Sequence, residues 1–155
     1  MRVAVCDPGI ADTGVIAYDT ASRAIVDAAT FRTSASGPRP GFEATLARAS
    51  GQVDRVLEFM RDNGCEMLVA EGYEDIQGPQ RGAKHRWTTP LMLGILSERC
   101  GSVVWQSPVM VMTSYRDHKA AWKAGFHNIV EGDEMLTNDH LRSCGCHLLA
   151  WESSR

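Results

Sequence analysis

The first 33 residues contain three short apolar segments whose connections are too short to hold a helix. Residues 2–6 (RVAVC) are apolar and partly β-branched, and they end at Asp7, which a Pro-Gly turn follows. Residues 14–18 (GVIAY) and 24–33 (AIVDAATFRT) come next. Strands joined by such short connections pair antiparallel, because a parallel pair needs a crossover of about a dozen residues or more. The sequence therefore predicts an antiparallel three-stranded meander.

Helices and strands alternate in the rest of the chain. Residues 43–62 carry apolar side chains at helical spacing, and residues 66–70 (EMLVA) read as a strand that ends at Glu71. Because a helix connects it to the meander, this strand is expected to run parallel to the first. The other predicted elements are a helix at about 89–99, a strand at 102–106, a helix from 107 to about 124 and a helix from about 137 to 151. This order predicts one α/β domain, residues 1–155, with a mixed five-stranded sheet flanked by helices.

Composition limits the class of protein. With 44% hydrophobic and 23% charged residues, the chain is typical of a globular protein. It has no apolar run of about 18 residues and no signal-like N-terminus, so we expect no membrane span and a location in the cytoplasm. The five cysteines include no CxxC pair, which favours small buried thiols over a zinc site.

Two carboxylates end predicted strands. In α/β sheets, ligand sites collect at the carboxyl ends of the strands, so Asp7 and Glu71 are expected at one edge, within reach of one cation. Mg²⁺ prefers such oxygen ligands. Two alternatives stay open: Asp7 as a turn residue, and Glu71 as a strand-end charge that faces solvent. Asp139 can close the site from the last helix, but taken alone it is more often an ordinary helix-start charge.

The charge is unevenly distributed along the chain. A net charge of −3 argues against a surface that binds nucleic acid everywhere, but the predicted loop after Glu71 is locally basic. Its side chains are candidates for contacts with backbone phosphates, with Tyr73 or Trp87 stacking on an unpaired base. The basic residues are Arg81, Lys84, His85 and Arg86. A solvated connection explains this loop equally well.

Several blocks, taken in order, resemble RuvC-type Holliday junction resolvases of the ribonuclease-H-like superfamily. The blocks are VAVCDPG at 3–9 with Thr13-Gly14, VAE at 69–71, Leu93-Gly94 with Arg99-Cys100-Gly101, Gln106-Ser107-Pro108, and Asn138-Asp139-His140 with His147-Leu148-Leu149. The likeness covers nearly the whole chain. The short length and slightly acidic charge are more similar to phage-encoded members than to the bacterial housekeeping enzyme.

This resemblance implies a fold, an activity and a ligand set. The fold is ribonuclease-H-like, and the activity is endonucleolytic cleavage of four-way or other branched DNA by two Mg²⁺ or Mn²⁺ ions. Asp7 would bridge both ions, Glu71 would bind one and Asp139 the other, while Lys119 matches a lysine near the scissile phosphate. The location would be the cytoplasm of a bacterium or of a phage-infected host.

A homodimer is the expected assembly, because a four-way junction offers two equivalent strands to cut. The predicted helix from Thr89 to Arg99 is a candidate interface. It is equally consistent with a helix buried in its own monomer.

One departure from the family leaves other functions open. The family places a fourth ligand, Asp or His, three residues before the last Asp, and that position is Leu136 here. Asp133, Glu134 and His140 are possible substitutes, but none has the expected spacing. Two alternatives therefore remain: a YqgF-like nuclease of the same fold that acts on RNA, and a non-catalytic protein that binds branched DNA.

Overall fold

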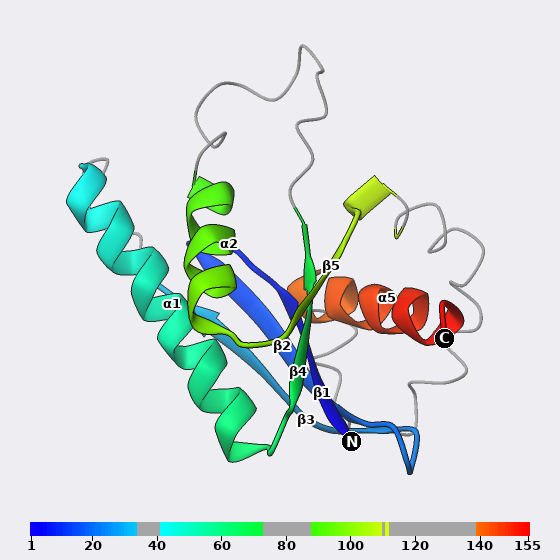
Figure 1. Cartoon of the computed structure of the whole chain (residues 1–155). Helices are drawn as coiled ribbons and strands as arrows, with labels where there is room; N and C mark the ends of the chain where they lie inside the picture. Colours follow the sequence, from blue (N-terminus) through cyan, green and yellow to red (C-terminus); the bar gives the residue numbers. More distant parts are fainter. Residues whose placement is uncertain (34–40, 73–87, 110, 112–138) are drawn as a thin grey trace.

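The computed structural model describes residues 1–33, 41–72, 88–109, 111 and 139–155 (Figure 1). Its elements are β1 (Arg2–Asp7), β2 (Asp12–Asp19), β3 (Ala24–Arg32), α1 (Phe42–Asp62), β4 (Met67–Glu71), α2 (Thr88–Arg99), β5 (Val103–Gln106) and α5 (Asp139–Ser153). Each of them was predicted, with ends within about two residues of those observed. The helix predicted from residue 107 to about 124 lies largely outside the described residues.

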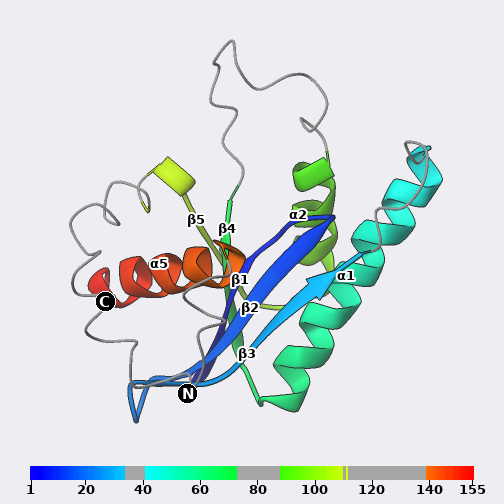
Figure 2. The ribbon, with the colours of Figure 1, turned by 180° about the vertical axis from the view of Figure 1, so that it is seen from behind.

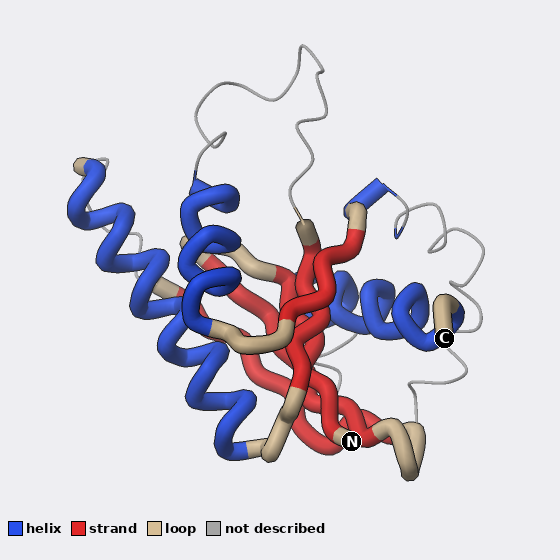
Figure 3. The backbone as a smooth tube through the Cα atoms, in the orientation of Figure 1, coloured by secondary structure: helices blue, strands red, loops and turns tan. Residues whose placement is uncertain are grey.

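The strands form one mixed sheet, drawn red in Figure 3. Their order in the sheet is β3-β2-β1-β4-β5. β2 pairs antiparallel with both β1 and β3, as the short connections predicted. β4 pairs parallel with β1, and β5 pairs parallel with β4. The α/β class and the five-stranded sheet flanked by helices are therefore confirmed.

Helices cover both faces of this sheet. α1 and α2 lie on one face and α5 lies on the other, as the two opposite views show (Figures 1 and 2). Because strand side chains alternate between faces, Ala4 and Cys6 pack toward α1 and α2, whereas Val3 and Val5 pack toward α5. Trp151 of α5 is buried in the second of these clusters.

The apolar face of α2 is buried within the monomer. Met92 and Leu96 are fully buried in the cluster that α2 shares with α1. The structure therefore supports the monomer-core interpretation of this helix. A homodimer remains a prediction.

A tryptophan in a predicted strand is expected in the core, but Trp105 is not a core residue. Its exposed fraction is 39%, and that of Val104 beside it is 38%. The physical reason is that, among the strands that the structure describes, β5 lies at the edge of the sheet and pairs only with β4. An edge strand has a neighbour on one side only and leaves part of its surface uncovered.

All five cysteines are free thiols; Cys6, Cys100 and Cys144 are buried, as predicted, whereas Cys65 and Cys146 are half-buried. Burial raises the pKa of Cys65 to about 11 and that of Cys146 to about 12. Protonated thiols are poor metal ligands. Within the described segments, no helix is long and apolar enough to cross a membrane.

Candidate functional site

Asp7 and Glu71 end two neighbouring parallel strands. Cys6 of β1 lies opposite Ala70 of β4, so the next residue of each strand is a carboxylate at the same edge of the sheet. Both side chains are mostly buried, with exposed fractions of 18% for Asp7 and 29% for Glu71. The structure thus brings these two predicted residues together.

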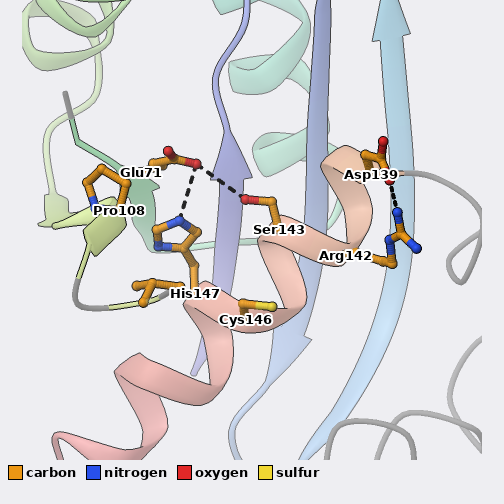
Figure 4. Close-up of a pocket in the computed structure, with 8 residues that line it drawn as sticks. Glu71, Pro108, Asp139, Arg142, Ser143, Cys146 and His147 are labelled. Carbon is orange, nitrogen blue, oxygen red and sulfur yellow. Dashed lines mark hydrogen bonds and ion pairs between the residues drawn. The ribbon is translucent and has the colours of Figure 1, made fainter. Parts of the chain in front are cut away.

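α5 presents three polar side chains to the two carboxylates. His140, Ser143 and His147 are three and four residues apart, a spacing that places them on one face of a helix. His140 Nδ1 lies 2.9 Å from Asp7 Oδ2. Ser143 Oγ donates to Glu71 Oε2 at 3.3 Å, and His147 Nε2 lies 3.3 Å from the same oxygen (Figure 4).

The adjacent Thr13 and Gly14 explain how α5 comes so close. The buried Thr13 donates its hydroxyl to Gly9 O at 2.6 Å, which ties down the turn that follows Asp7. A Cβ on Gly14 would lie 2.8 Å from both the carbonyl carbon and the Cβ of His140. Only glycine leaves room for the first turn of α5 at this point of β2.

His147 and Gln106 are a further pair behind Glu71. His147 Nδ1 lies 2.9 Å from Gln106 Oε1, and His147 is 1% exposed. Sequence reasoning assigned no role to Ser143, His147 or Gln106. The signal that was present is the i, i+3, i+7 set of polar residues that His140 begins on α5, a helix whose facing side is otherwise apolar.

Asp139 lies apart from this pair of carboxylates. Its side chain is 81% exposed and forms an ion pair with Arg142, and Figure 4 shows that pair well away from Glu71. Its neighbour His140 contacts the Asp7 carboxylate. In the part of the chain that the structure describes, no three His, Cys, Asp or Glu side chains are grouped as a ready metal site. The ligand role of Asp139 stays a prediction.

A cavity of about 340 Å³ opens beside Glu71. It lies between the start of α5 and the chain just after β5. It is lined by Glu71, Pro108, Val111, Asp139, Arg142, Ser143, Cys146 and His147. Asp139 and Glu71 therefore face one cavity, although they are not in contact.

The remaining predicted site residues lie outside the described residues. These are Lys119, Arg81, Lys84, His85 and Arg86, together with Leu136 at the expected fourth-ligand position.

The two carboxylates differ in how well their charge is compensated. Burial raises the pKa of Asp7, the hydrogen bond from His140 opposes this, and repulsion from Glu71 adds to it, so the net direction is upward. Burial would also raise the pKa of Glu71, but hydrogen bonds from His147 and Ser143 bring it below its usual value. Asp7 is therefore the carboxylate whose charge is less well stabilised, and a nearby cation would stabilise it.

The protein without metal is expected to lose stability as the pH rises above about 6.5, the usual pKa of histidine. The hydrogen bond to Asp7 raises the pKa of His140 in the folded state. This pairing stabilises the fold fully below the unfolded-state value and is lost as the pH rises through the folded-state value. Urea unfolding in EDTA between pH 6 and pH 9 measures the slope. The same slope in His140→Asn would contradict this origin.

Two solved structures share the fold of this chain. One is Thermus thermophilus RuvC in complex with a Holliday junction substrate, with a TM-score of 0.62, 18% identity, and coverage of 99% of this chain and 96% of that chain. The other is Thermus thermophilus RuvC, with a TM-score of 0.63, 18% identity, and coverage of 99% and 97%. No family model and no curated protein sequence matches the chain. The likeness confirms the ribonuclease-H-like fold that the sequence resemblance implied.

Proposed function

We propose that this protein is a divalent-metal-dependent nuclease that cleaves four-way or other branched DNA. The observation that carries the proposal is the pairing of Asp7 and Glu71 at the carboxyl edge of the sheet, braced by α5. The similarity in fold to RuvC, one structure of which is in complex with a Holliday junction substrate, supports branched DNA as the substrate class.

The chemistry of Asp7 and Glu71 fits a cation such as Mg²⁺ or Mn²⁺. Two mostly buried carboxylates repel each other, and this repulsion helps to raise the pKa of Asp7. The contacts from α5 fall on Asp7 Oδ2 and Glu71 Oε2. The other oxygens, Asp7 Oδ1 and Glu71 Oε1, are the proposed ligands, since oxygen donors suit these ions.

Different residues of the protein have different proposed roles around a bound phosphodiester. Bound Mg²⁺ or Mn²⁺ supplies Lewis-acid activation of water and charge stabilisation at the phosphate. Asp7 and Glu71 hold the ions, of which we propose two. Lys119 offsets charge on the phosphate, and the basic residues between positions 81 and 86 contact the DNA backbone.

The ligand from α5 is proposed to be His140, in preference to Asp139. His140 already contacts Asp7, whereas Asp139 is paired with Arg142. His140 and Ser143 also have the three-residue spacing that the resemblance assigns to the fourth ligand and the last Asp. On this assignment, Ser143 stands where an aspartate is expected.

His140→Asn should weaken Mn²⁺ binding by about tenfold to a hundredfold, whereas Asp139→Asn should change it by less than about threefold. The reason is that, of these two residues, His140 is the one that lies against the carboxylate pair. Isothermal titration of the DNA-free protein with Mn²⁺ compares the two variants. The reverse ranking would restore Asp139 as the ligand.

Ser143→Asp should strengthen binding of the second cation by about tenfold or more, because ligand charge sets affinity at oxygen sites. The new carboxylate would take the place of a hydroxyl that now donates to Glu71. Mn²⁺ stoichiometry and affinity provide the measurement, and Ser143→Ala is the matched control. Unchanged binding in Ser143→Asp would place the second site elsewhere.

A substrate panel tests the proposal as a whole. The wild-type protein with Mg²⁺ or Mn²⁺ is given a four-way DNA junction, a flap, a linear duplex and a structured RNA. We expect paired nicks at symmetric positions of the junction, as a two-fold homodimer would produce. Preference for RNA would support the YqgF-like alternative. Junction binding without cleavage would support the non-catalytic alternative.

A further inference from the structure

We infer that Gln106 and His147 form a hydrogen-bonded chain that fixes the orientation of the Glu71 carboxylate for cation binding. His147 is then a positioning residue and Gln106 its support. The inference rests on the proposed cation site and adds two residues that the ligand set does not contain.

Gln106 and Glu71 are held side by side by the backbone. They are direct partners in the parallel ladder between β4 and β5. Gly72 N also donates to Gln106 O at 2.7 Å, which continues the pairing just beyond Glu71. Partners in a ladder project their side chains to the same face of the sheet, and the contacts with His147 show that this face is the one covered by α5.

His147 of α5 contacts the side chains of both Gln106 and Glu71. Its ring nitrogens lie 2.9 Å from Gln106 Oε1 and 3.3 Å from Glu71 Oε2. The ring is almost fully buried, so neither contact is exchanged with solvent. A buried polar ring with both nitrogens engaged has little freedom to rotate.

The hydrogen bond between His147 and Glu71 has a defined direction. A carboxylate oxygen accepts, so His147 Nε2 donates to Glu71 Oε2. The other ring nitrogen, Nδ1, faces Gln106.

This contact selects which oxygen of Glu71 is presented to a cation. Ser143 and His147 both act on Oε2. The carboxylate is thereby held with Oε1 as the oxygen offered to the ion. Residues that orient a ligand in this way commonly change metal affinity by about tenfold to a hundredfold when they are replaced.

The test is Mn²⁺ binding to the DNA-free protein, followed by electron paramagnetic resonance, together with urea unfolding of the same samples. His147→Phe keeps a ring but removes both nitrogens, and should weaken Mn²⁺ binding by about tenfold to a hundredfold. His147→Gln restores a donor toward Glu71 and should recover part of this loss. Gln106→Leu should weaken binding by itself but add nothing in the His147→Phe background, because the two residues act through one chain.

Leu148→Ala is the matched control for a purely structural role. Leu148 is the next residue of α5 and is buried in the core cluster between α5 and the sheet. It should lower the free energy of unfolding without changing Mn²⁺ affinity. If His147→Phe does not fold, Mn²⁺ binding to His147→Gln and Gln106→Leu tests the chain in its place.

The outcomes separate this inference from the proposed function. Wild-type Mn²⁺ affinity in the His147 and Gln106 variants would contradict the positioning role of these residues. Additive losses of affinity in the variant that combines His147→Phe with Gln106→Leu would contradict it as well. A different outcome is that the variants lose Mn²⁺ binding as expected while the wild-type protein cleaves no DNA or RNA. That result would support the positioning role of His147 and Gln106 and contradict the proposed nuclease activity.

Discussion

Asp7→Asn is expected to slow cleavage of a four-way junction by about a thousandfold or more, equivalent to about 4 kcal/mol in the barrier. Asp7 is the central carboxylate of the proposed cation site, and an amide cannot supply the negative charge that binds the ion. Junction binding should change by no more than about threefold, because the DNA contacts are proposed to lie elsewhere. Single-turnover cleavage and gel-shift binding measure the two effects separately.

The same substitution should stabilise the protein in EDTA. Burial and repulsion from Glu71 disfavour the charged form of Asp7, and a neutral amide removes that penalty. Asp54→Asn, which alters an exposed carboxylate paired with Arg99 on the other face of the sheet, is the control and should change neither cleavage nor binding. Cleavage by Asp7→Asn at the wild-type rate would remove this edge of the sheet as the catalytic centre.

Gly14→Ala is expected to lower the free energy of unfolding by about 1–3 kcal/mol and to reduce cleavage with it. The added methyl group would lie 2.8 Å from backbone and side-chain carbons of His140, so the first turn of α5 must move away from β2. His140 then loses its contact with Asp7. Urea unfolding and single-turnover junction cleavage by the same variant measure the two effects.

Gly51→Ala is the matched control for that prediction. Gly51 lies in α1, where an added Cβ meets nothing within 4 Å. Alanine in a helix interior should stabilise the fold by about 0.5–1 kcal/mol. Equal destabilisation of both variants would mean that the close approach of α5 to Gly14 is not what makes glycine necessary there.

Most of the sheet follows from local properties of the sequence. Short connections force the first three strands into an antiparallel meander, and the long helix α1 carries the chain across to a parallel β4. The positions of Asp7 and Glu71 at one edge follow from the same topology. Trp105 shows the limit of such reasoning, because residue type alone does not reveal that β5 is an edge strand.

The details of α5 required the tertiary structure. Successive helical residues point about 100° apart, so a choice between Asp139 and His140 depends on how the helix is rotated over the sheet. That rotation is decided by the packing of Leu141 and Cys144 against β1 and β2, and by the space at Gly14. None of these contacts is local in sequence.

The sequence by itself therefore determined the antiparallel meander, the parallel β4 and the two carboxylates at the ends of β1 and β4, because these depend on the lengths of the connections between strands. Only the tertiary structure decided which side chains of α5 face that pair. When α5 packs on the sheet, all its side chains take up their orientation together. The observed orientation points His140, and not the adjacent Asp139, at Asp7, and it places Ser143 and His147 against Glu71.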